Sequence, residues 1–295
     1  MKHHRVETIS SLEQTTLLIA YGEEDLRKGE QSHCEVSPSA MLSLVASLTP
    51  FCDFNQSPRN MYQCQMGKQT MAIPYHATHR SDTKSYHIHT PQSPIVRNQN
   101  YSQYGFDDYA LGTNAVVAVI SYTGYDMEDA MIINKASYDR GFGHGSVRLT
   151  KVIDLNNMHK AGEKQRFRFS NVVPHDTTEP RQGRPFESRL GPDGLPEVGQ
   201  LLEDHHPLCV IVDEVTGRHK VTLFKSAESA IVEEVRLVGG DPSNRQRALP
   251  RVFIKLRHNR NPVPGDKFSS RHGQKGVMSR LWPAEDMPFS EGGGP

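Results

Sequence analysis

The hydrophobic pattern of the chain predicts many short strands and few helices. Two segments carry the signal for a helix start, a serine that caps the helix followed by proline at the first helical position, at residues 37–38 and 57–58. Proline suits that position because its φ is fixed and it has no N–H to donate. Apolar residues at helical spacing then favour a helix until Pro50. The second helix, continuing over 59–71, has few apolar residues, so we expect it to be exposed or to line a site.

Runs of consecutive apolar residues predict the strands. Ala115–Ser121 predicts a strand buried on both faces. After a turn at 124–126, a second apolar run follows at 131–133, and 137–141 resembles a short helical turn closed by glycine. Further short strands, separated by glycine, proline and asparagine, are predicted at Leu208–Val212, Lys220–Phe224, Ala230–Val238 and Arg251–Leu256. The pattern therefore predicts an α+β protein with β-barrels rather than a doubly wound sheet.

Length and composition narrow the class of protein. The 295 residues suffice for one large domain or two ordinary ones, and 34 basic residues balance 34 acidic ones. No apolar run is long enough to span a membrane, and the first ten residues lack the apolar core of a secretory signal. The four cysteines form no CxxC pair, which predicts a reducing compartment and neither a disulfide framework nor a zinc site.

The balanced total hides a strongly basic segment. Residues 251–280 hold eight Lys and Arg and one acid, Asp266. A local excess of this size is typical of a surface that contacts a polyanion, although a solvated charged face is the alternative.

One acidic pair suggests metal chemistry. Glu128 and Asp129 are adjacent and lie between two apolar runs. Carboxylates are the ligands that Mg²⁺ prefers, and it commonly takes one or two of them together with substrate phosphates. A turn with two solvated acids is the competing interpretation. Four histidines between 76 and 89 fit no common zinc spacing, so no metal role is predicted for them.

Two further segments suggest phosphate binding. Residues 265–276 combine glycines with Lys267 and Lys275; glycine lets a backbone approach a phosphate closely, and lysine supplies a mobile cation. Arg59 and Tyr62 share a face near the start of the second predicted helix, where an anion is favoured and tyrosine can stack on a base. Neither segment is a Walker A loop, and ordinary surface residues remain the alternative for both.

Three segments resemble one protein family in their sequences and in their order along the chain. They are Asn55–Gln69, Gly124–Asn134 and Gly265–Gly276. They are similar to segments of the second-largest subunit of multisubunit DNA-directed RNA polymerases, the equivalent of bacterial β. Two stretches, Val119–Met131 and Ser279–Phe289, resemble the eukaryotic RNA polymerase I form more than the polymerase II or III forms.

The resemblance, which covers about residues 30–295, implies a fold and its divisions. It implies a double-psi β-barrel with an inserted β-rich wall unit and an N-terminal helical fork region. The implied divisions are the end of the external and fork regions with the start of the hybrid-binding region at 1–110, the first barrel half at 111–150, the wall at 151–250 and the second barrel half, truncated, at 251–295.

The resemblance also implies roles for single residues. Asp129 matches an acid that helps to hold the magnesium ion arriving with the nucleotide, and Glu128 matches its neighbour at the same ion. Lys267 and Lys275 match lysines that contact RNA 3′-end phosphates and the incoming nucleotide. Nucleotide contacts are implied for Arg59 and Tyr62, and nucleic-acid contacts for Gln56 and Arg271.

The implied function is transcription of rRNA by nucleotidyl transfer in the nucleus and nucleolus. The implied cofactor is Mg²⁺ shared with the largest subunit, with no zinc site here. The implied partners are that subunit, other core subunits, template DNA, the RNA transcript and NTP. The sequence corresponds to about a quarter of such a subunit and has no capping signal at its C-terminal end, so the fragment alone is expected to be inactive. The alternatives are an inactive fragment that binds nucleic acid or subunits, and a polymerase II-like or viral homologue.

Overall fold

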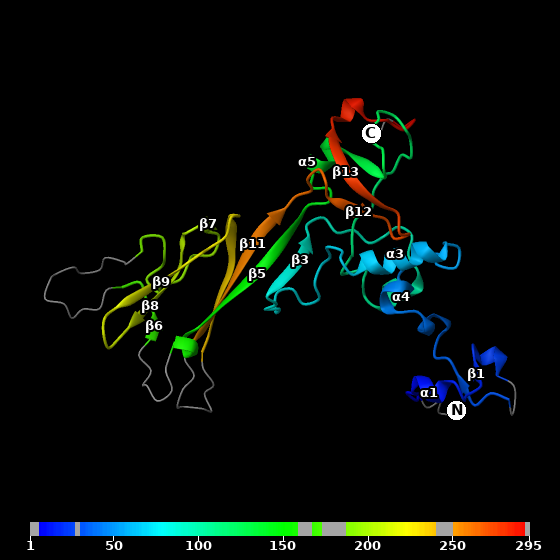
Figure 1. Ribbon diagram of the computed structural model, residues 1–295, viewed down its shortest axis with the longest axis horizontal. Helices are drawn as coiled ribbons and strands as arrows, with labels where there is room; N and C mark the ends of the chain where they lie inside the picture. Colours follow the sequence, from blue (N-terminus) through cyan, green and yellow to red (C-terminus); the bar gives the residue numbers. More distant parts are fainter. Residues whose placement is uncertain (1–5, 27–29, 159–166, 173–186, 240–249, 293–295) are drawn as a thin grey trace.

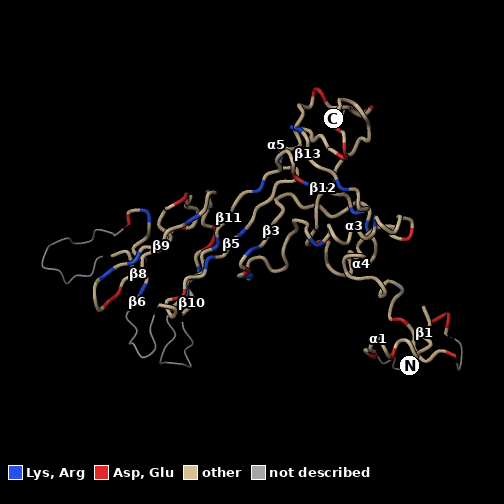
Figure 2. The backbone as a smooth tube through the Cα atoms, viewed as in Figure 1, with Lys and Arg blue, Asp and Glu red and all other residues tan. Residues whose placement is uncertain are grey.

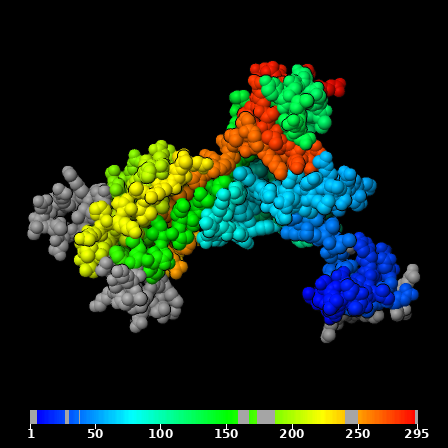
Figure 3. Space-filling view, viewed as in Figure 1, coloured from blue at the N-terminus to red at the C-terminus, as the bar shows by residue number. Residues whose placement is uncertain are grey.

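Among the residues that the structure describes, the chain forms four small sheets and a few short helices (Figure 1). The computed structural model describes residues 6–26, 30–158, 167–172, 187–239 and 250–292. The prediction of a mixed α+β class is confirmed. The space-filling view shows an N-terminal lobe joined by a narrow neck to a body from which the sheets extend (Figure 3).

The largest sheet is five-stranded and antiparallel. Its central strands, β5 and β11, pair along ten residues, from Asp154 opposite Arg251 to Gly145 opposite Arg260. Its strand order is β3 (Lys84–Ile88), β5 (Gly145–Asp154), β11 (Arg251–Arg260), β10 (Ala230–Val238) and β7 (Leu201–Leu202).

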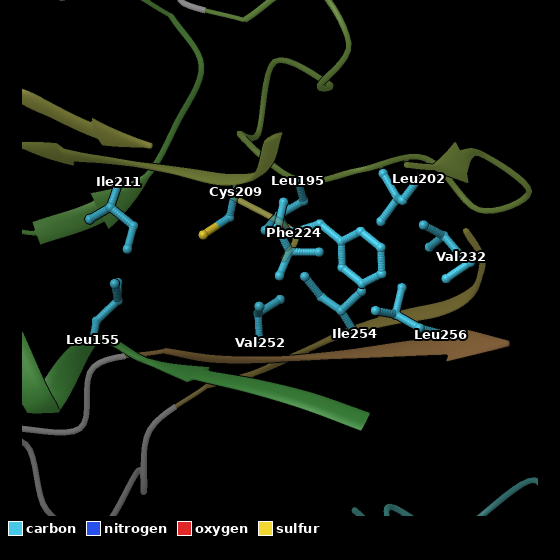
Figure 4. Packing of buried hydrophobic residues seen from close by; sticks show 12 residues of the cluster. Leu155, Leu195, Leu202, Cys209, Ile211, Phe224, Val232, Val252, Ile254 and Leu256 are labelled. Atoms are coloured by element: carbon cyan, nitrogen blue, oxygen red, sulfur yellow. The ribbon is translucent and has the colours of Figure 1, made fainter. Parts of the chain in front are cut away.

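One face of this sheet forms the main hydrophobic core. Alternate residues of β11, Val252, Ile254 and Leu256, are fully buried, as expected for side chains that share one face of a strand. They pack against Phe224 and Cys209 from the facing three-stranded sheet (Figure 4). That sheet has the order β6 (Phe167–Phe169), β8 (Pro207–Asp213) and β9 (His219–Leu223).

The opposite face of the five-stranded sheet is charged. Arg148 on β5 makes two hydrogen bonds to Glu233, at 2.6 and 2.8 Å, and Lys255 contacts Glu234 at 2.6 Å. A register shift between Val232 and Glu234 lets both glutamates reach this face. Burial raises the pKa of Glu233, but the hydrogen bond and charge of Arg148 outweigh it, so the pKa lies below its usual value.

A third sheet joins distant parts of the chain. β12 (Lys267–Ser269) and β13 (Lys275–Trp282) form an antiparallel hairpin, and β13 pairs in parallel with β4 (Ala130–Asn134). Val277 lies opposite Ala130 in this pairing. The helix α5 (Lys135–Asp139) follows β4 directly.

The N-terminal half contains most of the remaining short elements. A small cluster of Leu48, Tyr101 and Phe106 forms its core. The elements are α1 (Ser11–Gln14), β1 (Ile19–Ala20), η1 (Glu23–Asp25), β2 (His33–Cys34), η2 (Pro38–Met41), α2 (Leu44–Ser47), α3 (Ser57–Gly67) and α4 (Gln99–Gln103), with η3 (Leu155–Met158) and η4 (Ala284–Asp286) later in the chain.

Both predicted helices differ in their bounds. The first is split into η2 and α2, because the Ser43 side chain caps a new helix by accepting a hydrogen bond from Ala46 N. The second, α3, includes Ser57 and ends at Gly67. Its N-cap is Gln56, which makes no side-chain cap hydrogen bond, so the prediction that Ser57 caps this helix is wrong.

The predicted buried strand at Ala115–Ser121 is wrong. This segment pairs with no strand among the described residues, and Val116 and Val119 are 98% and 93% exposed. An apolar run forms a strand only where a neighbour supplies both a hydrogen-bond ladder and a face to pack against. The remaining strand predictions hold within a few residues for β4, β8, β9 and β10, whereas β11 extends four residues beyond its predicted end.

Three further sequence expectations concern membrane spans, cysteines and the C-terminal end. Within the ranges given above, no helix is long and apolar enough to cross a bilayer. All four cysteines are free thiols. The last three residues of the predicted uncapped C-terminal end, 293–295, lie outside the described residues.

Candidate functional site

The β12–β13 hairpin carries two of the predicted lysines on one face. Lys267 lies opposite Val277 and Lys275 lies opposite Ser269. Directly opposite residues share a face, and so do residues two apart on one strand, so Lys267 and Lys275 are diagonal neighbours. Both are exposed. On the other face, Phe268 stacks on Phe142 with ring centroids 6.4 Å apart, which anchors the hairpin.

The first turn of α3 packs against the turn of this hairpin. The Arg59 guanidinium Nη1 donates a hydrogen bond to the Gly273 carbonyl at 3.2 Å. Asn55 lies one position before Gln56, the N-cap residue of α3. Its Nδ2 atom is 3.2 Å from His272 Nδ1. Figure 1 shows α3 directly beside the hairpin. The helix start and the glycine-rich turn, more than two hundred positions apart, therefore form one surface.

A cation–π contact joins Tyr62 of α3 to Lys275 of β13. The Lys275 ammonium lies 4.9 Å from the centre of the Tyr62 ring. Tyr62 is half-exposed and Arg59 is exposed, one helical turn apart. An exposed pair of this kind is worth about 0.5–1 kcal/mol, enough to bias where the lysine ammonium points.

The acidic turn lies at the other side of the hairpin. Glu128 and Asp129 have φ of 58° and 61°, so both adopt the left-handed conformation, and both are exposed. Two consecutive non-glycine residues in that region are uncommon and mark a turn held by its surroundings. The Asp129 carbonyl accepts a hydrogen bond from Val277 N at 3.2 Å, which places the acid directly beside β13.

Arg271 faces inward. Its Nη2 donates to the Val96 carbonyl, and its Nη1 is buried with no hydrogen-bond partner within the described ranges. Burial lowers the pKa of Arg271, and the Tyr101 hydroxyl partly opposes this. Its predicted contact with nucleic acid stays a prediction, and in this structure the side chain ties the hairpin turn to the segment before α4.

The site therefore gathers cations around the hairpin, with two acids at its edge (Figure 2). Five of the predicted residues, Arg59, Tyr62, Lys267, Lys275 and Asp129, belong to segments in direct contact. Gln56 is exposed at the start of α3. Sequence reasoning missed Asn55 and His272, whose only signal was their place inside the two motifs.

The acid pair is not part of a self-contained metal site within the described residues. Among the described residues, no group of three or more His, Cys, Asp and Glu side chains is placed to hold a metal. Glu128 and Asp129 are adjacent and exposed, so they can supply one or two oxygen ligands while phosphates and another chain supply the rest.

Two of the four clustered histidines, His87 and His89, pack against each other with ring centroids 6.1 Å apart. Burial is the main cause that lowers the pKa of His87, followed by the charge of Arg148.

Comparison with known proteins assigns the family. The model of the family RNA polymerase Rpb2, domain 6, matches residues 45–295. The chain belongs to this family of RNA polymerase subunits.

Several relatives that match most of the chain are subunits of RNA polymerase I. It is 48% identical over 291 residues to DNA-directed RNA polymerase I subunit RPA135 of Saccharomyces cerevisiae, covering 97% of this chain and 23% of the relative. It is 48% identical over 290 residues to subunit RPA2 of Mus musculus, covering 98% of this chain and 25% of the relative. The chain spans about a quarter of the length of the curated relatives that it matches. The resemblance to the polymerase I form of the second-largest subunit is confirmed.

Proposed function

We propose that this chain forms part of the active centre of a DNA-directed RNA polymerase I. In this role it binds the incoming NTP and the RNA–DNA hybrid during nucleotidyl transfer. The observation that carries the proposal is the contact of three separate segments, α3, the acidic turn and the β12–β13 hairpin, around Lys275. Identity near 48% to polymerase I subunits supports the choice of enzyme.

The cations of the site suit a triphosphate and an RNA end. Lys275 and Arg59 would bind phosphates of the NTP, and Lys267 the phosphate backbone at the RNA 3′ end. Tyr62 orients Lys275 and offers a ring edge to the nucleotide. Because the hybrid is held through its backbone, binding would depend on salt and little on sequence.

Chemistry in such a site is positioning together with charge neutralisation. The RNA 3′-hydroxyl attacks the α-phosphorus and pyrophosphate leaves, so no nucleophile from the protein is needed. The lysines and Arg59 would offset the charge of the phosphates. Glu128 and Asp129 would hold a magnesium ion shared with the largest subunit. Bound Mg²⁺ supplies Lewis-acid stabilisation of the phosphate oxygens.

The wider assignment follows from the same proposal. Segments 111–150 and 251–295 would be the two halves of a double-psi β-barrel, supported by the parallel pairing of β4 with β13. Residues 151–250 would be the wall, and 1–110 the external, fork and early hybrid-binding regions. The partners would be the largest and other core subunits, template DNA and RNA, in the nucleolus.

The role of Asp129 is tested by Asp129→Asn in the complete polymerase. Asparagine tolerates the left-handed backbone, so the substitution removes charge without forcing a new turn. We expect slower nucleotide addition at limiting Mg²⁺, by no less than the ~10–100-fold typical when a residue that merely orients a metal ligand is lost. Elongation rates across a magnesium titration measure the effect.

The matched control is Asp25→Asn, an exposed acid in the N-terminal lobe. It should leave the titration unchanged. A wild-type rate for Asp129→Asn at every magnesium concentration would remove the metal-binding role.

The lysines are tested by Lys267→Ala and Lys275→Ala. A charge-assisted hydrogen bond contributes about 1.5–3 kcal/mol, so each loss should weaken binding by about 10–100-fold. Each should also reduce the slope of log affinity against log salt by about 1, because one phosphate contact is lost. Dissociation of the RNA 3′ end and of NTP, measured from stalled complexes at several salt concentrations, gives both quantities. Lys225→Ala, an exposed lysine after β9, serves as the control, and an equal effect there contradicts the assignment.

A further inference from the structure

Two glycines of the hairpin touch the backbones of the two segments that carry the other site residues. A Cβ placed on Gly273 would lie 2.4 Å from the Arg59 carbonyl oxygen. A Cβ placed on Gly276 would lie 2.5 Å from the Asp129 carbonyl oxygen. Real Cβ atoms essentially never approach another heavy atom closer than 3.0 Å. Since both obstacles are backbone atoms, no side-chain rotation can relieve either contact.

Glycine is required at position 276 because there is no room for a Cβ atom, and not because of its backbone conformation. Gly276 is not among the residues with positive φ, so its backbone conformation is available to any amino acid. Gly273, with φ of 71°, requires both space and the left-handed conformation. The two positions therefore allow steric contact and backbone conformation to be separated by mutation.

Close approach to protein backbone is found at some glycines and not at others. A Cβ placed on Gly194, outside the site, would lie 2.8 Å from Ser170 N and from Val210 O. Gly112 has an ordinary φ and nothing within 4 Å of its added Cβ, and Gly265, at the start of the same hairpin, is also open. The two contacts at 273 and 276 flank Lys275, which Tyr62 holds from the α3 side.

We propose that Gly273 and Gly276 are positioning residues that set the spacing of the site. Gly273 seats α3 against the hairpin turn, and Gly276 seats the acidic turn against β13. Lys275 thereby lies between the segment that carries Arg59 and the turn that carries Asp129. The inference rests on the proposed function and adds which residues fix the geometry.

Gly273 contacts the segment of Arg59 and Gly276 the turn of Asp129, so substitutions at the two glycines should affect different steps of binding. In Gly276→Ala the Asp129 backbone must retreat by at least about 0.5 Å, which displaces the acid that would hold the metal. In Gly273→Ala the start of α3 must retreat, which displaces Arg59. A misplacement of about 1 Å in a catalytic site can lower the rate by about 10²-fold, so a displacement of about half that size should have a measurable effect.

The experiment measures binding without turnover, in the complete polymerase. Elongation complexes are stalled on RNA ending in a 3′-deoxynucleotide, and the dissociation constant of the next NTP is measured across a magnesium series. For Gly276→Ala we expect the magnesium midpoint to rise about three- to tenfold, with NTP affinity restored at saturating Mg²⁺. For Gly273→Ala we expect NTP affinity to fall by a similar factor at every magnesium concentration, with an unchanged midpoint. Gly112→Ala should change neither quantity.

The opposite pattern overturns the inference. Wild-type binding in both variants, or the same loss of NTP affinity in both with no difference in magnesium midpoint, shows that the glycines position neither group. Should Gly276→Ala not assemble, Gly273→Asn is measured in its place. Asparagine tolerates a positive φ, so only the contact with Arg59 remains. Weakened NTP binding in Gly273→Asn supports the proposal, and unchanged binding overturns it.

Asp129→Asn in the same assay distinguishes failure of the proposed metal-binding role from failure of the positioning role of Gly276. An unchanged magnesium midpoint in Asp129→Asn removes the metal-binding role that the proposed function assigns to this acid. A shifted midpoint in Asp129→Asn together with an unshifted one in Gly276→Ala refutes only the positioning role.

Discussion

At the scale of single residues, the site is shaped by local contacts that restrict each functional group. Lys275 has a ring beneath its ammonium, Arg59 is tied to the Gly273 carbonyl, and Asp129 lies in a left-handed turn. Each contact removes conformations that would otherwise have to be lost on binding, which is the physical meaning of preorganisation.

The contact between Tyr62 and Lys275 leads to a prediction. Tyr62→Leu removes the ring and about 0.5–1 kcal/mol, so NTP affinity should fall by about two- to fivefold, whereas Tyr62→Phe should keep most of it. Equilibrium NTP binding to stalled complexes measures the difference. Tyr86→Leu is the matched control, because Tyr86 makes a similar contact with Lys84 at 5.2 Å on the distant strand β3. Equal losses in the two leucine variants would show that the Tyr62 contact has no special role.

The residue types at the site were predictable from the sequence, but their contacts were not. Composition and motif spacing singled out Lys267, Lys275, Arg59 and the acid pair. Nothing in the sequence alone indicated that Arg271 would face inward, because its orientation depends on the Val96 carbonyl, far away in the chain. The glycines of the hairpin were expected to approach a phosphate, whereas in the structure two of them approach protein backbone.

At the scale of elements, the five-stranded sheet supports the site through its long central strands. β11 leads directly into the hairpin, so the position of Lys267 depends on how firmly β11 is held. The buried residues of β11 pack on the sheet formed by β8 and β9. Stability of that core is therefore connected to the geometry of the site.

Ile254→Ala tests this dependence. Ile254 is fully buried, so the loss of its side chain should destabilise the sheet by about 2–5 kcal/mol. Limited proteolysis across a urea series should show cleavage at lower urea than in the wild type. Val152→Ala, on the other face of the neighbouring strand and half-exposed, should change stability by no more than about 0.5 kcal/mol. Similar sensitivity in both variants would contradict the assigned core.

Strand prediction succeeded where a short apolar run marks the strand, whether its partner is local, as for β8 and β9, or distant, as for β4 and its partner β13. β8 and β9 follow one another and pair with one another. β8 is buried along its whole length, whereas β9 is only partly buried. β5 was missed because its residues alternate between a charged face and a core face formed by segments about a hundred positions away. The run at Ala115–Ser121 failed for the opposite reason, since a strong local pattern has no neighbour among the described residues.

At the scale of the whole molecule, the site is assembled from three regions widely separated in the sequence. The order of the motifs identified the family, but spacing along the chain carries no information about which motifs meet. The sheet arm formed by β5, β10 and β11 lies between the acidic turn and the hairpin in sequence, yet the parallel pairing of β4 with β13 brings their ends together.

That pairing has a consequence for synthesis of the protein on the ribosome. β4 is translated before the sheet arm, and its partner β13 only after that arm has been made. Until then the ladder groups of β4 facing β13 remain open, and pairings between such distant segments form slowly. The surface around Lys275 and Asp129 would therefore be among the last parts of this chain to form. A newly made chain should pass through a stage in which its main core is folded while this surface is still prone to aggregation.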